Sequence, residues 1–277
     1  MRADLIVSTY NAPRALALSL ASVARQSRSP SRVLIADDGS GQPTRDAIAR
    51  ASIAFPELEI EHVWHEDHGF EKNAILNKAI AASSAEYLVF TDGDCLLHPD
   101  FLQRHIALAA PGRFVCGSLI RLSAAATDAV TEEDVLSGRV FGQAWQKRWR
   151  VVDRFGTWLK SAPMPFPVMS ALEVVWPIRR SWMGSNSACW RADALAVNGY
   201  DEEMKYGGGD KEFGIRLRNA GIRPRPIRFT APVLHLDHPR GYADPVRMAF
   251  NRERIEQSRQ SGRTWAEDGL AKARGPA

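Results

Sequence analysis

The chain has 277 residues, of which 45% are hydrophobic and 25% are charged, a composition typical of a folded protein and not of a disordered one. Its net charge of +4 is a mild excess that does not predict nucleic-acid binding. The longest stretch without Asp, Glu, Lys or Arg covers residues 161–172, too short to cross a bilayer, and no signal segment precedes the first apolar run. Three cysteines without a CxxC spacing predict reduced thiols and a cytoplasmic protein.

Strands and helices alternate in the first hundred residues. Short apolar or β-branched runs predict strands over residues 5–9, 33–36, 58–64 and 87–90. Helical spacing predicts helices over residues 13–25, 44–52, 72–83 and 99–109. This alternation predicts an α/β fold with a Rossmann-like, mostly parallel central sheet that helices flank on both faces. Ligands in such sheets bind beyond the carboxyl ends of the strands, where the acidic turns at 37–40 and 92–94 fall.

The pattern is less regular after residue 110. It predicts strands over residues 114–119 and 227–236 and helices over residues 191–197, 211–219 and 244–260, followed by a loose polar tail. We therefore expect one domain in three parts. Residues 1–110 form a nucleotide-binding half, residues 111–242 an acceptor-side half, and residues 243–277 a C-terminal helix and tail.

The sharpest local motif is FTDGD, which ends the predicted strand 87–90. Side chains two residues apart on extended backbone share a face, so Asp92 and Asp94 can point to the same side. Two carboxylates suit Mg²⁺ or Mn²⁺, and such an ion neutralises a diphosphate. Asp and Gly also favour an ordinary tight turn, but the position after a buried strand favours the metal site.

A second acidic turn, in IADDGS, follows the predicted strand 33–36. Asp37 or Asp38 can accept a hydrogen bond from a base or a ribose there, as acidic residues do in dinucleotide folds. Either residue can equally be the N-cap of the next helix. The sequence contains no G-x-G-x-x-G after its first strand and no G-x-x-x-x-G-K-[ST], which excludes the dinucleotide loop and the P-loop.

Besides FTDGD and IADDGS, the sequence contains the motifs LIVSTYN, KNAILNKAI, GSNSACWRADALAVNGYDE, YGGGDKEFGIRL and VLHLDHP. In these motifs and in their order along the sequence, the chain resembles glycosyltransferase family 2 over roughly residues 3–240. The later motifs resemble a subgroup with a galactosyltransferase-like C-terminal module, which includes bacterial polysaccharide-synthesising enzymes. The resemblance implies a GT-A fold, Mn²⁺ or Mg²⁺ as cofactor, and inverting transfer of a sugar. The donor is a nucleotide-diphosphate sugar, with UDP expected, and the acceptor is a hydroxyl of a glycan or a lipid-linked molecule.

The resemblance also assigns roles to single residues. The residues implied on the donor side are Ser8, Tyr10, Asp38, Lys72, Asn77 and Asp92. Tyr10 would stack on the base, with a core aromatic as the alternative, and Asn77 is alternatively a helix residue bonded to backbone. The metal ligands implied are Asp94 and His235, with His238 as the second choice of histidine. We interpret Cys95, next to this motif, as a small buried hydrophobic residue rather than a thiolate ligand.

The motif YGGGDKEFGIRL carries the general base that the resemblance implies, Asp210. Attack by a sugar hydroxyl needs a carboxylate within hydrogen-bond reach of that hydroxyl. Gly209 stands where the family usually has Glu. The residues implied on the acceptor or sugar side are Trp182, Asn186, Gly209 and Glu212. Asp210 is alternatively, or in addition, an N-cap of the helix that follows.

Residues 139–180 are strongly basic. The basic residues are Arg139, Lys147, Arg148, Arg150, Arg154, Lys160, Arg179 and Arg180, against Asp153 and Glu173. The aromatic spacing from Phe141 to Trp149 predicts either an interfacial helix that meets anionic lipid at the inner membrane or a core-facing stripe. The segment equally fits a phosphate-bearing acceptor.

Two other functions stay open. A sugar-1-phosphate nucleotidyltransferase has a similar sheet, but normally a Gly-rich loop with Arg and Lys where this chain has STYNAPRAL. The second is a sugar-nucleotide-binding protein without activity. Intact Asp92, Asp94 and Asp210 disfavour it, whereas Gly209 leaves it open.

Overall fold

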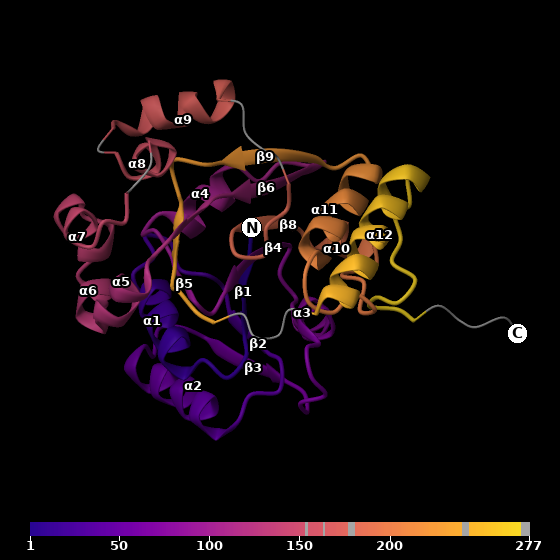
Figure 1. Cartoon of the computed structure of the whole chain (residues 1–277), viewed down its shortest axis with the longest axis horizontal. Coiled ribbons are helices and arrows are strands. Elements are labelled where there is room, and N and C mark those ends of the chain that lie inside the picture. Colours follow the sequence, from indigo (N-terminus) through magenta and orange to yellow (C-terminus); the bar gives the residue numbers. More distant parts are fainter. Residues whose placement is uncertain (153–154, 163, 177–180, 240–243, 273–277) are drawn as a thin grey trace, which may run out of the picture.

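A seven-stranded sheet with the order β3-β2-β1-β4-β8-β6-β9 forms the centre of the molecule (Figure 1). The computed structural model describes residues 1–152, 155–162, 164–176, 181–239 and 244–272. The strands of this sheet are β1 (Ala3–Thr9), β2 (Val33–Asp37), β3 (Ile60–Trp64), β4 (Tyr87–Asp92), β6 (Arg113–Gly117), β8 (Ser187–Trp190) and β9 (Arg223–Ile227). Strands β3, β2, β1 and β4 are parallel, and β8 is antiparallel to β4 and β6. The predicted α/β fold with a mostly parallel sheet is confirmed.

The register of the parallel strands brings their polar carboxyl ends together. Strand β1 is buried along its whole length, as expected for a central parallel strand that helices cover on both faces. Ser8 lies opposite Asp92 of β4, and Thr9 lies opposite Asp37 of β2. The two acidic turns therefore follow neighbouring ends of one sheet edge.

Two of the predicted strands are wrong in extent, because each divides between two sheets. The predicted strand 114–119 becomes β6 and β7 (Leu119–Arg121), and the predicted strand 227–236 becomes β9 and β10 (Val233–His235). The second sheet has the order β5-β10-β7, where β5 is Cys95–Leu96. The chain passes from one sheet to the other after Gly117, where a Cβ would lie 2.0 Å from Asn186 Oδ1. Strand β8 was not expected, since its four residues lead directly into a helix.

Helices cover both faces of the central sheet. One apolar core packs α1 (Pro13–Ala24), α2 (Gln42–Ala54) and α4 (Phe101–Ala107) against the sheet. The other packs α3 (Lys72–Ala82), α10 (Arg191–Ala196) and α11 (Gly209–Asn219). This layering leaves the carboxyl edge of β1, β2 and β4 to loops and to the ends of α3 and α11.

The part of the chain between β7 and β8 forms a group of short helices. They are α5 (Ala124–Ala129), α6 (Glu132–Leu136), the 3₁₀ helix η1 (Arg139–Phe141), α7 (Gln143–Arg148), α8 (Phe155–Ser161) and α9 (Phe166–Val175). Trp145 and Trp149 pack against a third apolar core, so of the two alternatives for this aromatic stripe the core-facing one holds. Arg154, Arg179 and Arg180 lie outside the described residues. Within the described chain, no helix has both the length and the apolar character needed to span a bilayer.

The C-terminal helix α12 (Pro245–Ser261) packs against α11 (Figure 1). The tail after this helix was predicted to be loose, but up to residue 272 it is held against the protein. Ala266 is buried, and Asn198 Nδ2 donates to the carbonyls of Ala266 and Ala271. The prediction failed because the tail is polar in composition but is held through its backbone.

Candidate active site

The turn after β4 places Asp92 beside the ends of β1 and α3. Asp92 Oδ1 accepts hydrogen bonds from Ser8 Oγ at 2.7 Å and from Lys72 Nζ at 2.6 Å. Gly93 N donates to Ser8 O at 2.7 Å, and a Cβ at Gly93 would lie 3.1 Å from that oxygen. The glycine thus lets the turn lie directly against β1. Three residues predicted from separate motifs, Ser8, Lys72 and Asp92, form one hydrogen-bonded group.

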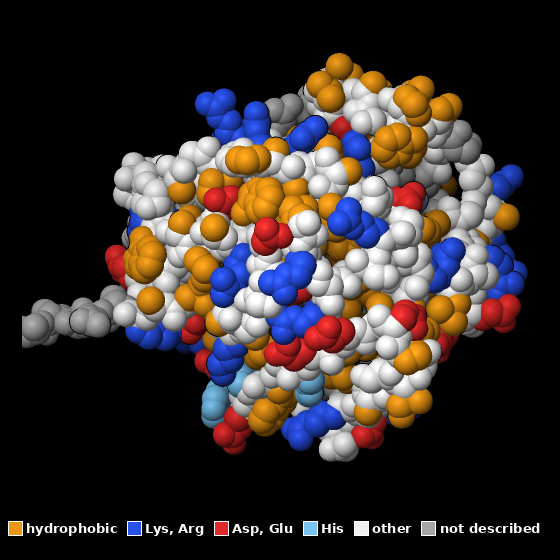
Figure 2. Space-filling model, turned by 180° about the vertical axis from the view of Figure 1, so that it is seen from behind, with side chains coloured by type: hydrophobic (Ala, Val, Ile, Leu, Met, Phe, Trp, Pro, Cys, Tyr) orange, Lys and Arg blue, Asp and Glu red, His pale blue; other side chains and the backbone are white. Residues whose placement is uncertain are grey.

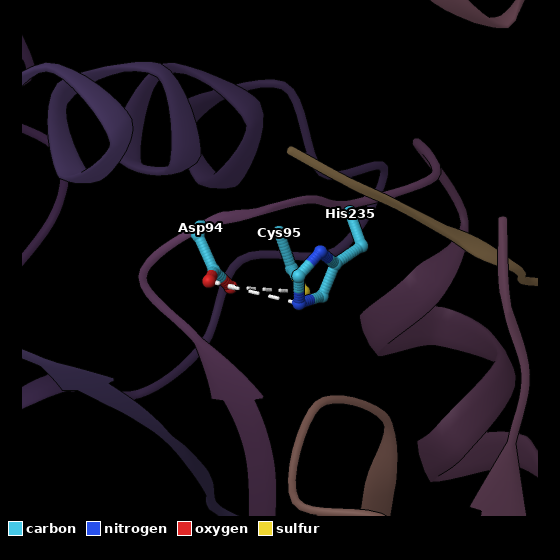
Figure 3. A group of neighbouring side chains, drawn as sticks. All are labelled: Asp94, Cys95 and His235. Carbon is cyan, nitrogen blue, oxygen red and sulfur yellow. Dashed lines mark hydrogen bonds and ion pairs between the residues drawn. The ribbon is translucent and has the colours of Figure 1, made fainter. Parts of the chain in front are cut away.

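Asp94 lies on the other side of this turn and faces two histidines. His238 Nε2 lies 3.2 Å and His235 Nε2 3.6 Å from the same oxygen, Asp94 Oδ2. Strand β10 brings His235 there, because His235 pairs with Cys95 of β5 (Figure 3). Cys95 Sγ donates to Asp94 Oδ1 at 3.6 Å, and burial raises the pKa of the Cys95 thiol well above its usual value.

This cluster fits a divalent metal ion by its donor chemistry. Ligand atoms of Asp94, Cys95 and His235 all lie within 4.8 Å of one another. Burial raises the pKa of Asp94, and the negative charge of Asp92 raises it further, although His235 and His238 act in the opposite direction. A carboxylate with nearby imidazoles suits Mn²⁺ better than Mg²⁺, which prefers oxygen ligands alone. A cation here would also offset the charge of the two neighbouring aspartates.

Asp210 lies near the same lysine, at the start of α11. Burial raises the pKa of Asp210; the Lys72 charge lowers it and the Asp92 charge raises it, so the net direction is upward. The residue in the N-cap position is Gly208, and no side chain caps this helix. The carboxylate accepts a hydrogen bond from the Gly184 backbone, and a Cβ at Gly184 would lie 2.6 Å from Asp210 Oδ1. The N-cap alternative is therefore wrong, and Asp210 is not needed to cap its helix.

Lys72 links these acidic groups. Burial alone would lower the pKa of Lys72, but Asp92, Asp210 and Asp94 together raise it far above its usual value. The side chains of Lys72 and Asp92 are 26% and 22% exposed, so this group is reachable from solvent. One ammonium thus stands among three carboxylates that come from β4, the following turn and α11.

Four other predicted residues lie in the interior. Asn77 is buried and exchanges hydrogen bonds with the Tyr200 backbone, and its Nδ2 also donates to Glu202. Asn186 is buried and its Nδ2 donates to the carbonyls of Ser118 and Ala231. Both amides hold segments far apart in sequence. The donor role of Asn77 and the acceptor role of Asn186 are therefore corrected to structural ones.

Trp182 and Glu212 are also internal. Trp182 is 3% exposed and packs edge-on against Phe90 and Phe213. Glu212 is fully buried and forms an ion pair at 2.8 Å with Arg216, which is also fully buried. Trp182 Nε1 donates to the Tyr200 hydroxyl at 2.9 Å. The predicted contacts of Trp182 and Glu212 with acceptor or sugar are wrong, because their polar groups are already used inside the core.

Gly209 supports the site through its lack of a side chain. A Cβ there would lie 2.5 Å from Asn73 Nδ2, which donates to the carbonyls of Asp201 and Met204. Asn73 thus occupies the space next to position 209 and ties α3 to the loop before α11. Gly209 is therefore needed for packing. The role of Asn73 could not be predicted, because its partners lie about 130 residues away in the chain.

The donor side contains residues that the sequence reasoning missed. Tyr10 is 49% exposed, which excludes a core aromatic, and its hydroxyl donates to Asp67 at 2.9 Å. Asp38 accepts from His65 Nε2 at 2.8 Å and from the Glu71 backbone at 3.0 Å. Burial raises the pKa of Asp38 even though His65 opposes this. The sequence HEDHG after the third strand is polar and charged, and this signal could have drawn attention to His65 and Asp67.

His62 is the corresponding partner of Asp37. Its Nε2 lies 2.8 Å from Asp37 Oδ2, and Ser40 N donates to Asp37 Oδ1. Burial would raise the pKa of Asp37, but the bonds from His62 and Ser40 hold it below its usual range. Asp37 is fully buried and holds the turn, which leaves Asp38 as the acid nearer to the site.

The sequence profile described as Glycosyl transferase family 2 matches residues 4–169, more than half of the chain. The chain belongs to this family. It is 28% identical over 235 residues to validoxylamine A glucosyltransferase from Streptomyces hygroscopicus subsp. limoneus. That match covers 79% of this chain and 48% of the relative, so the chain spans about half of the relative's length.

Solved structures of glycosyltransferases share the fold. A mannosyltransferase from Pyrobaculum calidifontis, in complex with GDP-Man and Mn²⁺, superposes with a TM-score of 0.58 at 20% identity. That match covers 87% of this chain and 58% of the other. S. aureus TarS, residues 1–349 with UDP-GlcNAc, superposes with a TM-score of 0.60 at 14% identity, covering 92% and 65%. The GT-A fold of this family member is thereby shown.

Proposed function

We propose that this glycosyltransferase is metal-dependent and inverting, and that it moves a sugar from a UDP-sugar to a hydroxyl of a glycan or lipid-linked acceptor in bacterial surface polysaccharide synthesis. The observation that carries the proposal is the shared position of Lys72 between Asp92 and Asp210. This arrangement brings a candidate general base and a candidate diphosphate-binding turn to one ammonium group. UDP-sugars are made in the cytoplasm, so we propose a cytoplasmic site of action, at the inner membrane where the acceptor is lipid-linked.

The base in this proposal is Asp210. Its carboxylate takes the proton of the acceptor hydroxyl while that oxygen forms a bond to the anomeric carbon. The bond between the anomeric carbon and the diphosphate oxygen breaks on the opposite face, which inverts the configuration and releases UDP. Burial raises the pKa of Asp210, which brings it closer to the pH at which a base must accept a proton.

The remaining residues bind the donor. Tyr10 and Asp38, with Asp67 and His65 behind them, surround the place for the base and ribose, and Ser8 orients Asp92. Asp94, His235 and His238 would hold Mn²⁺ or Mg²⁺, which when bound offsets the charge of the diphosphate. Lys72 holds Asp92 ionised and supplies a fixed positive charge on the same side.

A donor panel tests the proposal. Release of nucleoside diphosphate is measured with UDP- and GDP-sugars, with Mn²⁺, with Mg²⁺ and with a chelator, and UDP affinity is measured by calorimetry under the same conditions. We expect one UDP-sugar to turn over in the presence of metal only. Preferred turnover of a GDP-sugar would overturn the choice of donor. Release of pyrophosphate from a nucleoside triphosphate would indicate a nucleotidyltransferase. Tight UDP binding without turnover of any donor would indicate a binding protein.

A further inference from the structure

Helix α9 has an outer face made of apolar side chains. Val174 and Val175 are each 74% exposed, and Val168 on the same side of the helix is also exposed. Phe166 is exposed too, but it lies two turns before Glu173 and its ring packs against Arg104. Apolar groups at this exposure are common singly, but three on one side of a ten-residue helix are not. Figure 2 shows hydrophobic side chains gathered at the top of the view, where α9 lies in Figure 1.

The only charged residue of α9 is turned inward and fixes this orientation. Glu173 is 3% exposed, pairs with Arg104 at 2.9 Å, and accepts hydrogen bonds from the backbone of Phe229 and Thr230. A helix with one charge would be expected to present it to water. This helix instead buries its charge and exposes its valines.

Helix α8 extends the apolar region. Phe155 and Trp158 are 66% and 45% exposed, and their rings stack with centroids 5.8 Å apart. Residues of α7, α8 and α9, including Gln146, Lys160 and Met169, line one cavity of about 310 Å³, so the three helices pack together. We call the exposed set the α8–α9 surface; it consists of Phe155, Trp158, Val168, Val174 and Val175.

Exposed basic residues flank this surface on two sides. Lys147, Arg148 and Arg150 are exposed on α7 and the turn after it. On the other side α9 contacts β9, the edge strand whose Arg223 and Arg225 are exposed. From residue 139 to residue 176 the sequence has two acids, Asp153 and the inward-facing Glu173. Apolar side chains with aromatic residues and a basic surround match a bilayer interface with anionic headgroups.

We infer that the α8–α9 surface docks the protein on an anionic lipid membrane, with the valines and aromatic rings at the acyl boundary and the flanking arginines among the headgroups. This role is independent of the proposed donor chemistry, because none of these residues contacts Lys72, Asp92 or Asp94 in the described part of the chain. The surface differs from the aromatic stripe at Trp145 and Trp149, which faces the core.

Flotation of the whole chain with vesicles tests the inference, without donor or metal. The vesicles consist of phosphatidylcholine alone or of phosphatidylcholine with about 30% phosphatidylglycerol, and each is used at low and at high salt. Salt screens the contacts between basic side chains and anionic headgroups. We expect binding to the anionic vesicles and weakening by salt. Val174→Ser with Val175→Ser should lower binding at least about ten-fold, since each buried apolar group adds to partitioning.

Matched variants separate binding by this surface from nonspecific binding by exposed apolar or basic residues elsewhere. Ile53→Ser with Val246→Ser removes two side chains of 82% and 76% exposure elsewhere and should leave flotation unchanged. Arg148→Glu with Arg150→Glu should abolish binding, whereas Arg50→Glu with Arg218→Glu, the same charge change on α2 and α11, should reduce it only slightly.

Three results would overturn the inference. They are the absence of wild-type flotation at low salt, equal loss in the matched control variants, and self-association in sedimentation velocity that only the Val174 and Val175 variant removes. The last would make the surface a protein contact between two copies. A folded far-ultraviolet spectrum and unchanged thermal midpoint for each variant exclude misfolding as the cause of lost binding.

Discussion

Two carboxylates two residues apart in one turn have opposite surroundings. Burial would raise the pKa of Asp92, but Lys72 and Ser8 bind the carboxylate and hold that pKa below its usual range. Asp94 faces two imidazoles instead, and burial with the charge of Asp92 raises its pKa. The chain therefore supplies the counter-charge of Asp92 itself, whereas the charge of Asp94 is best met by a cation from solution.

The comparison is tested most directly at Asp94. Asp94→Asn keeps the shape but removes the negative charge, so we expect loss of turnover by roughly a thousand-fold or more, the scale of a metal-assisted charge offset. UDP affinity, measured by calorimetry, should fall only when Mn²⁺ is present. Asp100→Asn, the same change in an exposed residue of the following loop, is the control. Normal turnover of the Asp94 variant in chelator would show that this side of the turn binds no metal.

Asp210→Asn tests the base that shares Lys72 with Asp92. An amide can still accept the Gly184 hydrogen bond, so the site should keep its shape. We expect kcat to fall about a hundred-fold or more, the contribution of a general base, with donor affinity near wild type. Single-turnover rates and calorimetry measure the two quantities. Loss of nucleotide affinity with a normal rate constant would make Asp210 a donor-binding residue.

Lys72→Met removes the charge that the two acids share. Because Lys72 lowers the pKa of both Asp92 and Asp210, both pKa values should rise in the variant. A base must be deprotonated to work, so the acid limb of the rate profile should move to higher pH, and activity at a fixed acidic pH should fall more than activity at alkaline pH. Profiles of kcat from pH 5 to 9 measure this. A uniform loss at every pH would mean that Lys72 acts on the donor phosphates alone.

Much of the nucleotide half could be predicted from the sequence, because β1, β2 and β4 are buried and show as apolar runs that end in polar turns. FTDGD therefore led correctly to the strand-end position of Asp92 and Asp94. The second half was predicted less well. The division of the predicted strand 114–119 occurs where Asn186, a residue about 70 positions away, packs against Gly117 and bonds to Ser118, and strand β8 has only four residues.

The interior residues were the main error in the site. Asn77, Asn186 and Glu212 stand in motifs of the family, and Trp182 stands just before one. Beside the local pair of Glu212 with Arg216, these residues have partners from distant parts of the chain, such as Tyr200 for Asn77 at a separation of 123 residues and Ser258 for Glu212 at a separation of 46. A motif does not tell whether a polar side chain binds a ligand or a distant backbone group. His65 and Asp67 were missed for the related reason that their partners, Asp38 and Tyr10, come from other loops.

His105 differs from His235 and His238, which face the carboxylate of Asp94, and this difference has a consequence for the stability of the protein. His105 is fully buried, and its Nε2 lies 2.9 Å from Asn186 Oδ1, an acceptor, while Nδ1 has no partner in the described structure. With no carboxylate beside it, burial lowers the pKa of His105 to about 3. The unfolded chain binds a proton near pH 6.5, but the folded chain does not until about pH 3.

Stability should therefore be lost as the pH falls from about 6.5 toward 3, at up to about 1.4 kcal/mol per pH unit. His105→Gln can still donate to Asn186 and has no such proton, so its unfolding free energy should change less between pH 7.5 and pH 5 than that of the wild type. Urea unfolding at the two pH values measures this difference. His68→Gln, which replaces a histidine whose side chain is 64% exposed, should keep the wild-type dependence. If His105→Gln keeps that dependence too, the imidazole is protonated inside the folded protein, and Asn186 cannot be its only polar contact.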